Sequence, residues 1–201
     1  MPNTASPAVT STVGLKNVII APVVSDTDAG VSYGTLQDFA GAIDAQIAPE
    51  NAEADVQYCD DTEFAVTYPD PEIKLTMEMA DIPLLIQEMI LNNIIDDNGV
   101  LIRAAGDTPG YFALGFKSEK ADGTYRFVWL FKGRAAPMTE QYHTKEGTTL
   151  TRQTGKLEWT FIKRTFDKRY QAIADEGQNG FTPEKAAAFL TSLYTPVVAV
   201  S

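Results

Sequence analysis

The residues that could do chemistry are few and lie far apart in the sequence. His143 is the only histidine and Cys59 the only cysteine among 201 residues. A serine-histidine-aspartate triad or a thiol dyad would have to use His143, and the residues beside Cys59 supply no positive charge to activate its thiol. A single cysteine also excludes an internal disulfide and a multi-thiolate metal site. We therefore expect no nucleophilic enzyme and no such metal centre.

Stretches rich in aspartate also depart from known ligand-binding patterns. Residues 26–30 read Asp-Thr-Asp-Ala-Gly, as at the start of a calcium loop, but the sixth position is Val31 and the twelfth is Gln37. A calcium loop needs glycine and a bidentate glutamate there, so we expect a solvated turn. The adjacent aspartates at 60–61 and 96–97 would point apart in a strand or into solvent in a turn. The sequence thus favours neither a cofactor nor a catalytic site.

Charge is distributed unevenly along the chain. Before residue 100 there are seventeen acidic residues and two lysines, whereas the remainder has ten acidic and fourteen basic residues. The overall charge of −11 disfavours a grip on nucleic acid. The acidic part of one copy could instead meet the basic part of the next, which is head-to-tail self-association. The alternative is that strands interleave distant segments, so that both signs mix within one subunit.

Length and hydropathy set the expected organisation. We expect a flexible N-terminal arm at 1–14, a single domain at 15–196 and a short C-terminal tail at 197–201. The arm has no positive charge and no apolar segment, and no eighteen apolar residues run together. Neither a secretion signal nor a membrane span is predicted, and synthesis in the cytoplasm follows.

Alternation of apolar and polar residues predicts strands. Residues 72–79 alternate without error, and residues 41–49 repeat the pattern more weakly. A hairpin is expected where 111–117 and 124–133 flank Asp122-Gly123, a pair that favours a tight turn. The second strand of this hairpin is apolar on both sides in its middle, so it should be covered twice. Residues 157–164 add another strand.

Two helices should interrupt these strands. The first is predicted from 81 to 99 and is apolar around nearly its whole circumference, apart from a stripe through Glu88 and Asn92. Such a helix needs two apolar partners, its own sheet and either more of the same subunit or a neighbouring copy. The second helix should begin at Thr182 and stop before Pro196.

Ordered sequence pieces resemble one known family. Residues 96–102, 107–118 and 123–133 are similar to the major tail proteins of long-tailed, non-contractile phages. Shorter pieces agree in order and spacing and extend the resemblance over most of residues 13–170; these are 13–16, 33–35, 40–43, 80–84 and 160–164.

The resemblance implies a fold and a role. It implies the phage tail-tube fold, mainly β, as a β-sandwich or partly closed β-barrel, with one packed helix and a short C-terminal helix. Copies would form hexameric rings that stack into a tube, through which double-stranded DNA passes without specific binding. Its partners would be itself, the tape-measure and other tail proteins, and no membrane. The protein would be made and assembled in the cytoplasm of the host bacterium and reside in the virion tail.

Two groups of residues are candidates for this role. An acidic wall would let DNA slide, whereas a basic wall would hold it. The polar faces of the strands at 41–49 and 72–79 therefore supply the candidate lumen-lining residues Asp44, Gln46, Glu72, Thr76 and Glu78. The polar stretch 137–155 is long for a structureless loop, and the family's rings use long loops to hold one another. It supplies the candidate inter-ring residues Thr139, Tyr142, His143, Thr148, Thr149 and Thr151.

Two other functions compete with a non-contractile tail tube. A contractile tail, a secretion needle or a tail-like bacteriocin would use a related tube protein. A carbohydrate-binding β-sandwich would display Trp129 or Trp159 on an open face. Both tryptophans fall in phase with other large apolar residues, so we expect them in the core.

Overall fold

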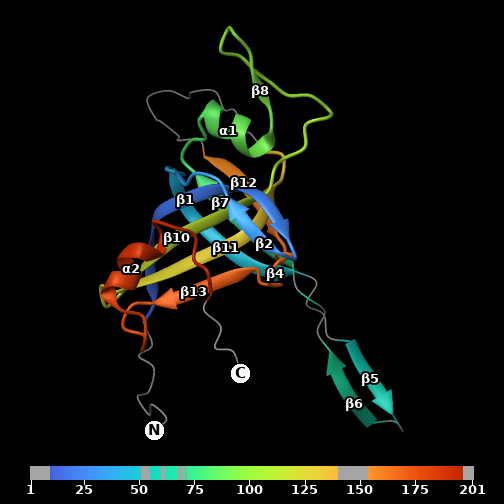
Figure 1. Ribbon diagram of the computed structural model, residues 1–201, viewed down its shortest axis with the longest axis vertical. Coiled ribbons are helices and arrows are strands. Elements are labelled where there is room, and N and C mark those ends of the chain that lie inside the picture. The colour runs from blue at the N-terminus through green and yellow to red at the C-terminus, as the bar shows by residue number, and fades with distance from the viewer. Residues whose placement is uncertain are drawn as a thin grey trace, which may run out of the picture.

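The computed structural model describes residues 10–50, 55–59, 62–67, 70, 72–139 and 154–196. The elements are β1 (Thr12–Thr27), β2 (Gly30–Tyr33), β3 (Gln37–Asp38), β4 (Ala42–Glu50), β5 (Asp55–Cys59), β6 (Thr62–Thr67), β7 (Glu72–Met79), α1 (Leu84–Leu91), β8 (Ile94–Ile95), β9 (Leu101–Ile102), β10 (Phe112–Lys120), β11 (Tyr125–Ala135), β12 (Gly155–Phe161), β13 (Gln171–Asp175) and α2 (Pro183–Phe189). This is a mainly β fold with two helices in the described residues, as the sequence predicts (Figure 1).

One large antiparallel sheet organises the described residues. Its strands follow one another in the order β2, β1, β10, β11, β12, β7 and β4, while β3 pairs with β1 and β13 pairs with β11. β5 pairs with β6, and β8 pairs with β9, in two small separate ladders. The predicted strands correspond to β4, β7, β10, β11 and β12, and Gly123 takes a φ of 82° in the turn between β10 and β11. The division into arm, domain and tail stays a prediction.

The core lies on both faces of this sheet. Val128 and Leu130 of β11 belong to one apolar cluster, which they share with β1, β7, β10, β12 and α1. Phe127, Trp129 and Phe131 belong to a second cluster, which α2 covers. β11 is therefore buried on both sides, which confirms the prediction from its doubly apolar pattern.

A bulge divides β11 into two halves. The register shifts between Leu130 and Gly133, so that Gly133 lies opposite Phe161 of β12. A Cβ atom on Gly133 would lie 2.4 Å from the Phe161 ring, which explains why glycine stands there. The shift brings Ala135 into the first cluster and leaves Arg134 on the opposite face.

A single stretch of chain links the two ends of the strand order. β3 pairs with β1, and after Gly41 the chain continues as β4, which pairs with β7. Gly41 has a φ of 95°, and its carbonyl accepts a hydrogen bond from the Ala80 N–H at 2.7 Å. A sheet whose ends share one stretch of chain must curve around its core. Closure into a barrel or sandwich stays a prediction.

The first helix is shorter than predicted. α1 spans Leu84–Leu91 and ends because Asn92 takes the left-handed conformation, with φ 56° and ψ 37°. Asn98-Gly99 does not end a helix but forms the turn of the β8–β9 hairpin, since Asp96 accepts the backbone N–H groups of Asn98 and Val100, both at 2.9 Å. The second helix begins after Thr182 as predicted, and its Ala186 and Phe189 are buried.

Candidate functional site

The five residues predicted to line a lumen lie on one face of neighbouring strands. In the register of β4 and β7, Asp44 lies opposite Glu78, and Gln46 lies opposite Thr76. Glu72 occupies the same face two positions before Lys74. On the other face of β7, Ile73, Leu75, Met77 and Met79 are buried in the first cluster. The alternation therefore places every predicted lumen residue on the side away from this core.

β12 extends this polar face, which sequence reasoning missed. Lys156 lies opposite Glu78, and Glu158 lies opposite Thr76, so each row of the face runs across three strands. Lys156, Glu158 and Thr160 alternate with the buried Leu157, Trp159 and Phe161, a pattern that indicates an exposed face of β12 but not its pairing with β7. We call this surface the acidic face; its charged members are Asp44, Glu50, Glu72, Glu78, Glu158, Lys74 and Lys156.

Ion pairs neutralise only part of the acidic face. Lys74 pairs with Glu50, and Lys156 pairs with Glu158 at 2.8 Å. The hydrogen bond from Lys156 holds the pKa of Glu158 below its usual value, and the bond to Glu50 raises the pKa of Lys74. Five carboxylates thus face two ammonium groups, and the surface carries a net negative charge. It can repel a polyanion but offers no arrangement for acid-base catalysis.

The tryptophans do not serve a binding surface. The side chains of Trp129 and Trp159 are fully buried. Trp129 Nε1 donates a hydrogen bond to the Phe189 carbonyl at 2.8 Å, and Trp159 packs edge-on against Phe112. Both belong to the core, as predicted, and neither forms the open aromatic platform that a carbohydrate-binding module would need.

The predicted inter-ring residues are only partly described. Thr139 forms an isolated antiparallel bridge with Lys156, at the border of the acidic face. The other members of the set lie outside the described residues; they are Tyr142, His143, Thr148, Thr149 and Thr151. Because His143 is among them, its pairing with Cys59 of β5 stays untested.

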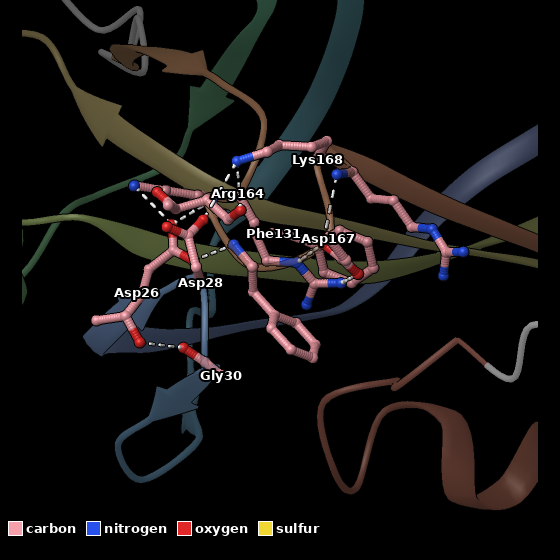
Figure 2. A network of polar contacts seen from close by, with 12 residues as sticks. Asp26, Asp28, Gly30, Phe131, Arg164, Asp167 and Lys168 are labelled. Carbon is pink, nitrogen blue, oxygen red and sulfur yellow. Dashed lines mark hydrogen bonds and ion pairs between the residues drawn. The ribbon is translucent and has the colours of Figure 1, made fainter.

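Asp26 is the exception within the solvated turn predicted at 26–30. Its side chain is 3% exposed and accepts hydrogen bonds from Lys132 Nζ at 2.7 Å and from the backbone N–H groups of Thr165 and Phe166 (Figure 2). Burial opposes ionisation, but these three donors outweigh it and lower the pKa of Asp26 to about 2. The rest of the turn behaves as expected, since Thr27, Asp28 and Ala29 are exposed and the Asp28 side chain is 89% exposed.

A buried arginine extends the same network. Arg164 is 2% exposed, donates to the Asp167 carboxylate and the Tyr33 hydroxyl, and lies over the Phe131 ring at 3.8 Å (Figure 2). Burial would lower the pKa of Arg164, but the bonds to Asp167 and Tyr33 raise it. The buried charges pair with one another, Asp26 with Lys132 and Arg164 with Asp167. The network therefore holds residues 164–167 against β1, β2 and β11.

Comparison with known families separates a tail tube protein from a carbohydrate-binding module. Within the described residues, no three His, Cys, Asp or Glu side chains cluster closely enough to hold a metal ion. A family model for phage tail tube proteins matches residues 8–195. This chain belongs to that family. A search of curated proteins found no match.

Membership makes the chain a structural component of a virion tail. Tail tube proteins assemble with copies of themselves and with other tail proteins, and the match spans nearly the whole chain. The mainly β fold agrees with this assignment. Neither described helix of this tail tube protein is long and apolar enough to cross a membrane.

Proposed function

We propose that the protein is the ring-forming subunit of the tail tube of a long-tailed, non-contractile phage. Six copies form a ring, the rings stack, and double-stranded DNA passes through their lumen during ejection. The observation that carries this proposal is the acidic face of β4, β7 and β12, which bears five carboxylates and two lysines.

The acidic face suits the wall of a DNA channel. On β11, the side of the sheet opposite the first cluster carries Phe127 and Trp129 and is covered by α2. On β4, β7 and β12, the side opposite this cluster carries the charged residues and is open in the described residues. Duplex DNA bears one negative charge per roughly 1.7 Å of axis, so this surface repels it and retards it little.

The remaining partners follow from assembly. Tape-measure and other tail proteins meet the tube at its ends or within it, and assembly takes place in the host cytoplasm. Residues 139–151 join adjacent rings; support for this comes from their polar composition and from the Thr139–Lys156 bridge beside the acidic face.

Self-assembly of the purified chain tests the proposal. We expect native mass spectrometry to detect hexamers, and negative-stain microscopy to show rings and unsheathed tubes whose fraction rises with protein concentration. A spectrum that stays monomeric at every concentration, with no tubes in the micrographs, would count against a tube subunit. Rings of another size would retain the tube and correct the ring number.

A further inference from the structure

The β8–β9 hairpin lies at one end of the described molecule (Figure 1), and apolar side chains along it are exposed. Ile94 and Ile102 form a cross-strand pair and are 64% and 50% exposed, and Val100 beside them is 55% exposed. Leu84 and Leu85 of α1, at the same end, are also exposed. Grouped exposed residues of this size are typical of a protein interface.

The hairpin is held in one conformation before any partner binds. The Asp96 carboxylate accepts the N–H groups of Asn98 and Val100, and the Asp96 N–H donates to the Val100 carbonyl at 3.0 Å. Gly99 supplies the positive φ of 78° that the turn requires. A preformed projection loses little conformational entropy on docking. Asp97 at its tip is exposed.

A groove lies between β13 and α2, away from the β8–β9 hairpin (Figure 1). Its volume is 530 Å³, and Ile173, Phe181 and Tyr194 lie along it, with Ile173 57% exposed. Among the described residues that line it, Lys185 alone is charged. In the described sheet β13 pairs only with β11, so its other edge has no strand partner.

The two surfaces are both apolar and differ in the sign of their charge. One is an apolar projection, and the other is an apolar groove. The projection belongs to a segment, 75–102, that contains five acidic residues and no lysine or arginine. The groove contributes a lysine. Since the hairpin and the groove lie on different parts of the molecule, they cannot contact each other within one copy, but the hairpin of one copy can bind the groove of another.

We propose that the β8–β9 hairpin of one copy docks in the β13–α2 groove of the next copy. Ile94, Val100 and Ile102 then pack against Ile173 and Tyr194, and Asp97 pairs with Lys185. The occupant is thus a second copy of this chain. The contact rests on the proposed function, because it specifies one interface through which tail tube subunits assemble.

A mixing experiment separates this contact from other modes of assembly. Ile102→Asp disables the hairpin and leaves the groove intact, whereas Ile173→Asp does the reverse. Each variant alone should raise the concentration needed for assembly at least about tenfold, as expected for an apolar residue central to an interface. In an equimolar mixture, the intact hairpin of Ile173→Asp can dock in the intact groove of Ile102→Asp, but no second contact can follow. Native mass spectrometry should therefore detect mixed pairs of subunits or of rings that grow no further.

A charge swap tests the pairing of Asp97 with Lys185. Asp97→Lys and Lys185→Asp should each weaken assembly, and the two substitutions combined in one chain should restore it. Asp38→Lys is the matched control, because Asp38 is exposed on β3 and belongs to neither surface. Far-ultraviolet circular dichroism and thermal melting establish that each variant is folded.

The outcomes distinguish failure of this contact from failure of the tube function. Wild-type chain that never assembles overturns the tube function and the contact with it. If wild type, Ile102→Asp and Ile173→Asp all form tubes at the same concentration, the contact alone is overturned. Failure of the charge swap to restore assembly would also overturn the contact alone. Deletion of residues 197–201 tests the chain's own tail as occupant: a lowered melting temperature with unchanged assembly would give the groove to that tail and overturn the proposal.

Discussion

At the scale of single residues, the buried charges of this protein are structural and the exposed ones are available to partners. Asp26 and Lys132 are separated by 106 positions and form a buried ion pair that fastens the end of β1 to β11. No spacing rule connects two such residues, so the sequence could not reveal the pair. Asp26 lies close to the turn at 28–29 in the sequence, so its side chain was expected in solvent. The structure shows that the side chain is buried.

The Asp26 pair predicts a specific dependence of stability on pH. The pKa of Asp26 falls from 3.8 to about 2 on folding, so its ionised form stabilises the fold above pH 4 by roughly 2 kcal/mol. This stabilisation is lost as the pH falls from about 4 to 2. Asp26→Asn should therefore lower the free energy of unfolding at pH 7, and its difference from wild type should shrink below pH 4.

Urea denaturation at several pH values measures this difference. Asp38→Asn is the control, because Asp38 is exposed, and it should unfold like wild type throughout. A gap between Asp26→Asn and wild type that stays constant from pH 7 to pH 3 would show that the ionisation of Asp26 contributes nothing.

A second residue-scale prediction concerns the bulge in β11. Gly133→Ala adds a methyl group 2.4 Å from the ring of Phe161, which is fully buried and cannot move into solvent. We expect a loss of about 1 to 3 kcal/mol in the free energy of unfolding, as for other overpacked cores. Gly106→Ala is matched in chemistry and meets no atom within 4 Å, so its melting temperature should stay close to wild type. Equal melting temperatures for both variants would contradict the packing argument.

At the scale of elements, the sequence predicted β7, which has one exposed face, and missed β1, which is buried on both faces in its middle. β7 has one face on the core and one on solvent, so its sequence alternates and its bounds were predicted to the residue. β1 was missed because Val18 to Ala21 are buried consecutively, with Ile20 in one cluster and Ile19 in the other. A strand covered on both faces shows no period of two.

The sequence predicted the shared face of β4 and β7, but neither the end of α1 nor the contribution of β12 to that face. Asn92 is a residue type that favours the left-handed turn ending α1, but the apolar run after Pro83 continues through Ile94 and Ile95 and conceals this signal. The lumen-facing candidates on β4 and β7 share one face because alternation fixes the face of every residue in a strand. The contribution of β12 to that face depends on its pairing with β7, which only the fold reveals.

The stretch proposed to join rings gives a prediction at this scale. Replacing residues 140–152 by a short Gly-Ser turn retains Thr139 and its bridge to Lys156. Since shortening a loop changes its closure entropy only slightly, the melting temperature of the monomer should move little. Rings should still form but should not stack. Micrographs showing tubes at wild-type concentrations would remove this stretch from the stacking contact.

At the scale of the whole molecule, the uneven charge of the chain is partly satisfied inside one subunit. Acidic residues before position 100 pair with basic residues after it, which supports the interleaving alternative for these pairs; they are Asp26–Lys132, Asp28–Lys168 and Asp70–Lys163. The acidic face takes no part in these pairs. Its two lysines, Lys74 and Lys156, pair with two of the five carboxylates of the same face. Among the described residues, the other three carboxylates of this face, Asp44, Glu72 and Glu78, form no ion pair, so negative charge is concentrated there.

This concentration predicts how DNA passage responds to charge reversal. Asp44 and Glu78 lie directly opposite one another on β4 and β7, and both are exposed. Replacing both by lysine should leave tubes intact, while phage that carry the variant eject DNA more slowly at low ionic strength. Added salt should restore the rate, because the Debye length falls from about 30 Å at 0.01 M to about 8 Å at 0.15 M. The neutral variant Asp44→Asn with Glu78→Gln should eject at nearly the wild-type rate, since it removes repulsion without adding attraction. Ejection that is equally fast for both variants at every ionic strength would place β4 and β7 away from the lumen and leave the tube itself unchallenged.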